Sequence, residues 1–143
     1  MEELPAEVAA LRRILFFEGL TDADLGRLAR IGRRVTFAAG DHIVERESDR
    51  SGLFVIISGG AEVEAGGMVH VLGPGDFFGE MALLAGTRRT ATVIATQPVE
   101  AMAIETTYFK PFLIENPSVA VALLEGVAAR LNAVQRALDP DAD

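Results

Sequence analysis

The stretch Phe77-Phe78-Gly79-Glu80-Met81-Ala82-Leu83-Leu84-Ala85-Gly86-Thr87-Arg88-Arg89-Thr90-Ala91-Thr92-Val93 joins a glycine turn, a carboxylate, a short apolar helical turn and an arginine beside a hydroxyl. Gly79 allows the backbone to approach a ligand closely. Glu80 opens a helical turn whose free N–H groups, from Met81 to Leu83, are predicted to point at an anion. Arg89 supplies a full positive charge. Because a carboxylate accepts from a ribose hydroxyl and a guanidinium pairs with a phosphodiester, the cassette predicts a sugar-phosphate site.

This cassette closely resembles the phosphate-binding cassette of cyclic nucleotide-binding domains, such as those of the catabolite activator protein and of protein kinase A regulatory subunits. The match is specific, because glycine-glutamate, an apolar triplet and arginine-x-alanine-threonine fall in register. One departure is Arg88, which stands where the family often has proline. The resemblance implies cAMP or cGMP as ligand, with no other cofactor, and a site formed by Gly79, Glu80, Met81, Ala82, Leu83, Arg89 and Thr90.

An alternative stays open for the same residues. In that interpretation Glu80 and Arg89 only pair with each other, and the domain has kept its shape for protein–protein assembly without binding a ligand. Thr90 bears on the choice of base in the first interpretation, since its hydroxyl can accept a hydrogen bond from the 2-amino group of a syn guanine. Similar bacterial domains that bind cAMP often carry a hydroxyl there too, so cAMP and cGMP both remain candidates.

Length, charge and cysteine content limit the class of protein. The 143 residues are predicted to form one domain, and the net charge of −8 argues against nucleic-acid binding, which needs a basic face. The longest apolar runs, such as residues 53–57 and 119–124, are shorter than a membrane span. The acidic start without a secretory signal and the absence of cysteine favour a cytoplasmic protein that does not enter a membrane.

The chain is organised as helices, then short strands, then helices. N-terminal helices are expected within residues 1–32, where Thr21 with Asp24 reads as an N-cap. A β-roll is expected over 33–105 with the cassette at 78–92, helices over 106–138 and an acidic tail at 139–143. Strands are predicted around 35–37, 43–44, 53–57, 61–64, 68–72, 91–94 and 99–104, separated by glycine turns.

Short strands at even spacing predict an antiparallel barrel or jelly roll. The resemblance implies the β-roll of cyclic nucleotide-binding domains, mainly β with flanking helices, over about residues 15–138. Gly66-Gly67 predicts a hairpin with a primed turn. Val69, His70 and Leu72, on the strand after it, are candidates for the wall that contacts the base, although an exposed His70 without a partner is the simpler interpretation of that side chain.

The last helix carries apolar residues on one stripe, at Ala120, Leu124, Val127, Leu131, Val134 and Leu138. Either this stripe packs on the protein's own β-roll or it forms a seam between two copies in a homodimer. Thr106 or Thr107 is expected to cap the preceding short helix, and Ser118 the last one. The resemblance implies that the last helix closes over the base as a lid, which makes Arg130, Val134 and Gln135 candidate ligand contacts.

Other chemistry has little support in the sequence. His42 and His70 are the only histidines, cysteine is absent, and no serine stands in a nucleophile elbow, so no metal site and no catalytic residues are expected. No helix-turn-helix module is recognisable after the last helix. The sequence thus predicts a stand-alone regulatory or sensor domain that binds cyclic nucleotide and signals to an effector protein through its last helix.

Overall fold

The computed structural model describes residues 5–44, 52–85 and 91–138. The helices are α1 Pro5–Arg12, the 3-10 turn η1 Leu15–Phe17, α2 Asp22–Arg30, α3 Glu80–Ala85, α4 Thr106–Glu115 and α5 Pro117–Leu138. The strands are β1 Arg33–Phe37, β2 His42–Val44, β3 Gly52–Ser58, β4 Ala61–Ala65, β5 Met68–Leu72, β6 Phe77–Phe78, β7 Thr92–Ala95 and β8 Val99–Glu105.

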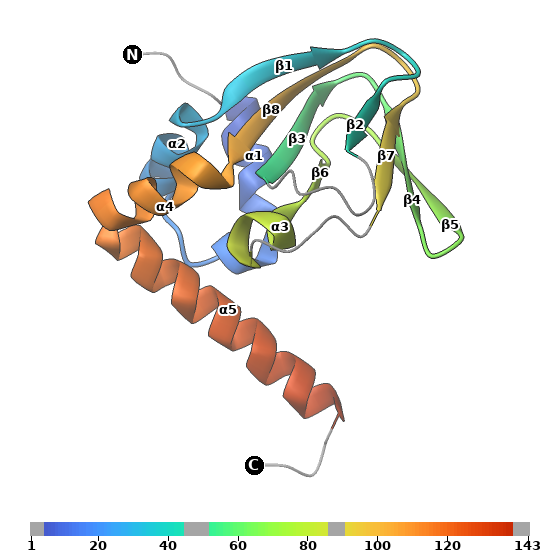
Figure 1. The fold of residues 1–143 in the computed structure, drawn as a ribbon. Helices are drawn as coiled ribbons and strands as arrows, with labels where there is room; N and C mark the ends of the chain where they lie inside the picture. Colours follow the sequence, from blue (N-terminus) through green and yellow to red (C-terminus); the bar gives the residue numbers. More distant parts are fainter. Residues whose placement is uncertain (1–4, 45–51, 86–90, 139–143) are drawn as a thin grey trace.

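The strands form two four-stranded sheets, and every pairing between strands is antiparallel. One sheet has the order β1-β8-β3-β6 and the other β2-β7-β4-β5. Figure 1 shows the helices gathered beside the first sheet, while the β4–β5 hairpin lies at the far end of the second. The predicted antiparallel β-roll with flanking helices is therefore confirmed. The short strand β6, inside the cassette, was not among the predicted strands.

The central strands of the first sheet, β3 and β8, are buried on both faces, and this explains why β3 reads as an almost unbroken apolar run. Leu53 and Val55 pack with Met102, Ile104 and the helices in one buried cluster. Phe54 and Ile56 point the other way, into the roll between the two sheets. Successive residues of a strand face opposite sides, so a strand that is covered on both sides needs apolar residues at every position.

The β4–β5 hairpin has the turn that its sequence predicts. Gly66 and Gly67 have φ of 58° and 81°, as a two-residue primed turn requires. The pairing of Ala65 with Met68 directly across this turn fixes the register of the hairpin. That register decides which β5 side chains face the roll.

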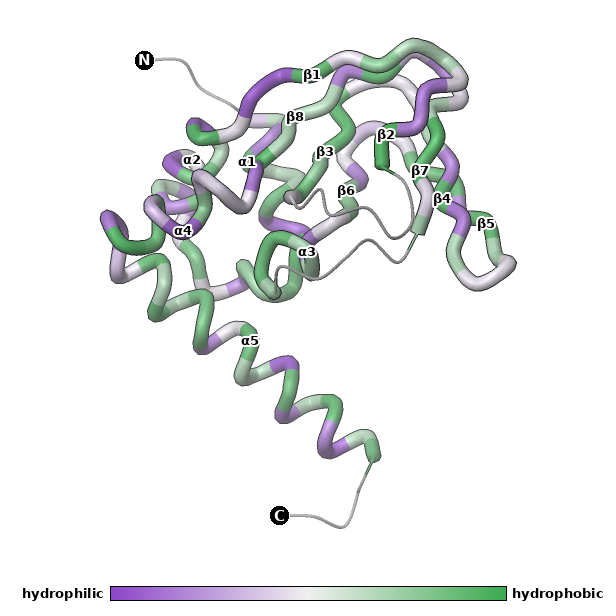
Figure 2. Tube along the Cα trace, in the orientation of Figure 1, coloured by the Kyte–Doolittle hydropathy of each residue, from purple (hydrophilic) through white to green (hydrophobic). Residues whose placement is uncertain are grey.

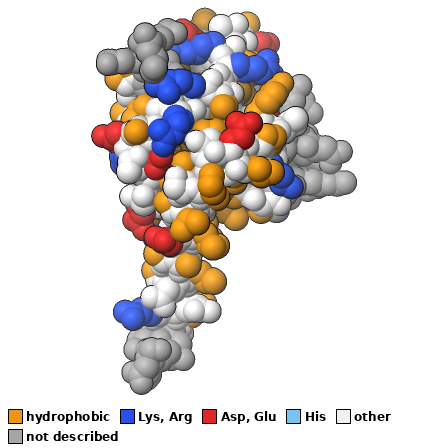
Figure 3. Space-filling model, turned by 90° about the vertical axis from the view of Figure 1, so that its left-hand side faces the viewer, with side chains coloured by type: hydrophobic (Ala, Val, Ile, Leu, Met, Phe, Trp, Pro, Cys, Tyr) orange, Lys and Arg blue, Asp and Glu red, His pale blue; other side chains and the backbone are white. Residues whose placement is uncertain are grey.

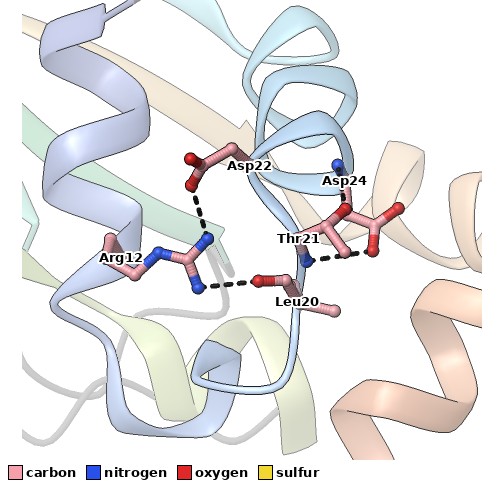
Figure 4. Close-up of polar contacts among 5 residues, drawn as sticks. All are labelled: Arg12, Leu20, Thr21, Asp22 and Asp24. Atoms are coloured by element: carbon pink, nitrogen blue, oxygen red, sulfur yellow. Dashed lines mark hydrogen bonds and ion pairs between the residues drawn. The ribbon is translucent and has the colours of Figure 1, made fainter.

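The N-terminal helices are joined by a connector with many polar contacts, residues 13–21, which contains η1 (Figure 4). Thr21 caps α2 as predicted, because its hydroxyl accepts from the Asp24 N–H at 3.1 Å and the Asp24 carboxylate accepts from the Thr21 N–H at 3.2 Å. Arg12 donates to the Leu20 carbonyl and to the Asp22 carboxylate, both at 2.6 Å. The two ends of the connector are thus held together by hydrogen bonds.

The other predicted caps are wrong by one or two positions. Glu105 is the N-cap residue of α4, which begins at Thr106 and makes no side-chain cap hydrogen bond. Helix α5 begins at Pro117, and the Ala120 N–H donates to the Asn116 carbonyl at 3.3 Å, so Ser118 lies inside the first turn. Proline suits the first helical position because its missing N–H would have no partner there.

Helix α5 leaves the body of the protein and projects away from the β-roll (Figure 1). Its packed residues are Val119, Leu123 and Gly126, near its start, whereas every residue from Ala128 to Leu138 is exposed. Of the predicted stripe, Leu124, Leu131, Val134 and Leu138 are exposed by 48–81%. Packing of this stripe on the protein's own roll is therefore wrong. Figure 2 shows hydrophobic and hydrophilic residues alternating along this projecting helix.

Candidate functional site

The approach to the cassette is a tight turn fixed by hydrogen bonds. Asp76 accepts from the Gly73 N–H at 2.8 Å, and its carbonyl accepts from the Ile56 N–H at 2.9 Å. Arg13, from the start of the connector, donates to the Gly75 carbonyl at 2.6 Å and lies 6.0 Å from the Phe77 ring centroid. The turn is thereby tied to β3 on one side and to the N-terminal segment on the other.

Gly79 makes the bend from β6 into α3. Its φ of 90° lies in the left-handed region, which costs other residues free energy, and its carbonyl accepts from the Leu83 N–H at 3.0 Å. Glu80 is consequently the first residue of α3 and is half-buried. The structure thus shows a bend at Gly79 that needs glycine, while the approach of its backbone to a ligand stays a prediction.

The N–H groups offered by α3 begin one residue earlier than predicted. Because the Leu83 N–H is used inside the helix, the groups that helix geometry leaves without a carbonyl partner are those of Glu80, Met81 and Ala82. Ala82 and Leu83 are 5% and 2% exposed, and Leu83 belongs to the buried cluster of the helices. Their side chains anchor α3, so only backbone groups of this segment are placed to meet an anion.

The register of the β4–β5 hairpin determines which side chains line the inner face of the second sheet. Val63 pairs with His70, and Val63 and Leu72 both pack against the interior of the roll. His70 and Leu72 therefore share the inner face, as alternation along a strand requires. Val69 pairs with Glu64, and both are exposed on the opposite face, so the structure does not bring Val69 together with the other candidates.

An aromatic ring of β3 stacks on the first residue of the cassette. The rings of Phe54 and Phe78 are stacked with centroids 5.3 Å apart and an interplanar angle of 11°, and Phe37 meets Phe54 edge-on at 6.4 Å. Phe78 immediately precedes Gly79, so this stack holds the strand that enters the site. The sequence reasoning assigned no role to Phe54, Phe78 or Val63. The alternation of Ala61, Val63 and Ala65 along β4 was the available signal for Val63.

The predicted phosphate-binding Arg89 and the neighbouring Thr90 lie outside the described residues, as does Arg88. Arg130, Val134 and Gln135 belong to the exposed outer half of α5, and Figure 1 shows this half pointing away from the β-roll. The structure therefore does not bring these three residues to the cassette. Among residues 5–44, 52–85 and 91–138, no group of three or more His, Cys, Asp or Glu side chains could hold a metal ion.

Two hollows are lined by described residues at other places. One, of about 310 Å³, is lined by β1, β3 and β8, including Val35, Phe37 and Phe54. The other, of about 400 Å³, lies where α4 meets β1 and β8, beside Tyr108 and Phe112. Neither is lined by a residue of the cassette.

Comparison with known proteins identifies the family of the chain. The family model described as "Cyclic nucleotide-binding domain" matches residues 34–116. A cyclic nucleotide-gated potassium channel of Mesorhizobium japonicum is 34% identical over 104 residues, which are 73% of this chain and 29% of the channel. A cAMP-dependent protein kinase regulatory subunit of Yarrowia lipolytica is 29% identical over 62% of this chain and 24% of its own length.

A solved structure covers nearly all of the chain. The N-terminal domain of a transcriptional regulator from Streptomyces coelicolor has 31% identity and a TM-score of 0.80, over 94% of this chain and 97% of that domain. The chain thus spans less than a third of the two curated relatives but almost the whole of this domain.

Proposed function

We propose that this chain, which belongs to the cyclic nucleotide-binding domain family, binds cAMP or cGMP and acts as a regulatory module. The observation that carries the proposal is the bend at Gly79, which has a φ of 90° and leads directly into α3 with Glu80 at its first position. This bend starts α3 with a glutamate, next to the backbone N–H groups that helix geometry leaves without a carbonyl partner. Such a combination suits a ligand that presents a hydroxyl near an anionic oxygen.

Each part of the ligand has a proposed partner. The Glu80 carboxylate accepts from the ribose 2′-hydroxyl, and the N–H groups of Met81 and Ala82, with the Arg89 guanidinium, meet the cyclic phosphate. The base lies along the inner face of the second sheet, against Val63 and Leu72, beside His70. The apolar side chains supply the hydrophobic surface that a planar base needs, and the Thr90 hydroxyl is the proposed acceptor for the 2-amino group of a guanine.

Isothermal titration calorimetry of the purified chain against cAMP and cGMP tests this proposal. Binding of either nucleotide is the expected result, and a ligand at about 100 times its dissociation constant stabilises the fold by about 2.7 kcal/mol. Glu80→Gln provides the chemical test, because it should weaken binding of the ribose nucleotide more than that of its 2′-deoxy analogue. Equal losses for the two ligands would remove the proposed role of the carboxylate.

We also propose that α5 is the element through which the domain contacts its signalling partner. The helix is exposed and apolar at Leu124, Leu131, Val134 and Leu138, and Figure 3 shows hydrophobic side chains continuing down this projecting helix. An unpartnered apolar stripe of this length favours a partner, either a second copy of the chain or an effector protein. If the domain instead binds no ligand and serves only protein–protein assembly, the same stripe would be its contact surface.

Sedimentation analysis separates these roles of α5. If α5 forms a homodimer seam, Leu131→Asp should convert a dimer into a monomer, because it puts a charge in the middle of the stripe. Leu15→Asp is the matched control, since Leu15 is 52% exposed but lies on η1, outside the stripe. A monomer at every concentration for the unmodified chain would leave an effector protein as the partner.

The length and apolar content of α5 would by themselves allow it to cross a membrane. We propose that it is a surface interaction helix of a cytoplasmic protein instead. Arg130 lies within it, and an arginine near the centre of a bilayer costs about 2.5–3.5 kcal/mol. Glu125 and Arg136 add further charges to the same helix.

A further inference from the structure

Strand β5 forms one edge of the second sheet. It stands at the end of the order β2-β7-β4-β5, and among the described strands it pairs with β4 alone. Figure 1 shows the β4–β5 hairpin at the far end of the roll from the helices. The outer edge of such a strand presents backbone N–H and C=O groups that can hydrogen-bond to a strand of another molecule.

The β5 edge lacks the features by which proteins usually prevent such pairing. Natural edge strands carry a lysine or another charge, a proline or a bulge. Strand β5, Met68–Leu72, contains no charged residue other than the histidine and no proline, and its register with β4 continues without a bulge. The side chains of Met68, Val69 and Val71 are 63%, 56% and 77% exposed. The edge is therefore straight, apolar and open.

We propose that β5 pairs with β5 of a second copy of this chain, antiparallel and about a two-fold axis at His70. The two four-stranded second sheets then continue into each other as one sheet. This inference goes beyond the proposed function, because it requires neither a bound nucleotide nor a contact of α5. A two-fold contact uses the same edge on both copies, so this assembly closes as a dimer.

The sequence of β5 is complementary to itself in this register. Val69 of each copy lies opposite Val71 of the other, and Met68 lies opposite Leu72. Apolar and β-branched pairs directly across two strands stabilise a sheet, whereas like charges in those positions destabilise it. A shift by two residues would leave two of the five residues of each strand without an opposite residue. Full overlap therefore selects the axis at His70.

The position of the nearby carboxylates favours a second copy over a basic segment of another protein. Glu62 and Glu64 lie on β4, where they pair with Val71 and Val69 and are exposed. In the proposed dimer the two β4 strands are three strand spacings apart, about 14 Å, which exceeds the Debye length of about 8 Å at physiological salt. A basic segment would meet no opposite charge on β5 itself, and these carboxylates would lie two spacings away. An uncharged strand is therefore the better partner.

The dimer is expected to be weak and to depend on salt. Five residues from each copy are far fewer than the about 20–30 residues a side of a standard interface. The two copies also carry a net charge of −8 each, so added salt should strengthen their association by screening the repulsion. A basic partner would show the opposite dependence on salt.

Engineered cysteines test the register, because the chain has no cysteine of its own. His70→Cys places the two thiols at the two-fold axis, where opposite Cα atoms lie about 4.5–5.5 Å apart, within the range of a disulfide. Val71→Cys is the matched control on the same exposed strand. Its two Cα atoms would be offset along the strands and about 8–9 Å apart, beyond the limit of about 7 Å.

After mild oxidation, a non-reducing gel should show a covalent dimer for His70→Cys and about tenfold less for Val71→Cys. Equal yields would indicate random collision of exposed thiols and would overturn the proposed pairing. The absence of a covalent dimer from His70→Cys would overturn it as well.

Sedimentation velocity over a range of concentrations tests the edge without a covalent bond. Carrying Leu131→Asp in every sample removes association through the stripe on α5. Adding Val71→Lys should raise the dissociation constant of the dimer about 2- to 30-fold, because it alters two cross-strand valine pairs. The new lysine lies opposite Glu62 across the hairpin, so the hairpin itself should persist.

Ile114→Lys is the matched control for this substitution. Ile114 is also β-branched and 80% exposed, but it lies on α4, away from β5, so the dissociation constant should not change. Equal weakening by the two lysines would contradict pairing through β5. A Leu131→Asp chain that stays monomeric at every concentration would overturn the dimer and leave a segment of another protein as the occupant of this edge.

Discussion

Replacing Gly79 by alanine isolates the backbone bend on which the proposed site depends. With a φ of 90°, Gly79 holds a conformation that costs an L-residue about 1–3 kcal/mol. For a domain of this size that strain lowers the melting temperature by about 3–10 °C. The variant should still fold, because the buried clusters on both sides of the first sheet do not include Gly79.

The effect on binding should exceed what the strain alone would cause. If the chain relaxes φ, Glu80 and the first N–H groups of α3 rotate away from the ligand. Losing one hydrogen bond to a charged group costs about 1.5–3 kcal/mol, or about 10- to 150-fold in affinity. Gly79→Ala should therefore lower both melting temperature and affinity.

Gly40→Ala is the matched control for this variant. Gly40 has nearly the same φ, 92°, a Cβ there meets nothing within 4 Å, and the residue is exposed in the turn between β1 and β2, outside the cassette. Melting curves and calorimetry on both variants should give similar losses of stability, with a loss of affinity only for Gly79→Ala. Equal affinities would refute the assignment of the bend to ligand binding.

Three further predictions concern residues that the sequence singled out. Arg89→Ala should weaken nucleotide binding by about 2–5 kcal/mol, because it removes one member of a desolvated charge pair, whereas calorimetry of Arg88→Ala should show a far smaller effect; equal losses would mean that the phosphate arginine is wrongly assigned. Thr90→Ala should weaken cGMP selectively and by no more than about tenfold, since one neutral hydrogen bond contributes about 0.5–1.5 kcal/mol; a matched loss for cAMP would assign the hydroxyl to the phosphate. Thr21→Ala should cost about 1 kcal/mol of stability through loss of the capping box, seen as a lower melting temperature, and a melting curve unchanged from that of the unmodified chain would contradict the contribution assigned to this cap.

The local features of the molecule could be predicted because their causes are local. Alternation of apolar residues, glycine turns and the Thr21 cap each act within a few residues, and the structure confirms the strands, the primed turn at Gly66-Gly67 and the capping box. The misplaced caps at Thr106 and Ser118 show the limit of such reasoning. Several polar residues in a row can each cap a helix, and the chosen start depends on how the helix packs.

The local geometry of the candidate site was predicted in part. The bend at Gly79 and the helix start at Glu80 could be anticipated, because both depend on adjacent residues. The face occupied by Val69 could not, because it depends on the register of β4 with β5, and a shift of one residue exchanges the two faces of a strand. The stacking of Phe54 on Phe78 likewise joins two strands separated by a long segment of chain.

By itself the sequence determined the class of fold and the position of the cassette along the chain, since patterning and turn chemistry are properties of short segments. Only the tertiary structure decided the direction of α5. The apolar stripe on that helix is compatible with several packings, and the choice among them came from a backbone contact between Gly126 and Phe16. Glycine has no side chain from which its contact partner could be inferred. The close contact of the helix could therefore be recognised only once both segments were placed in space.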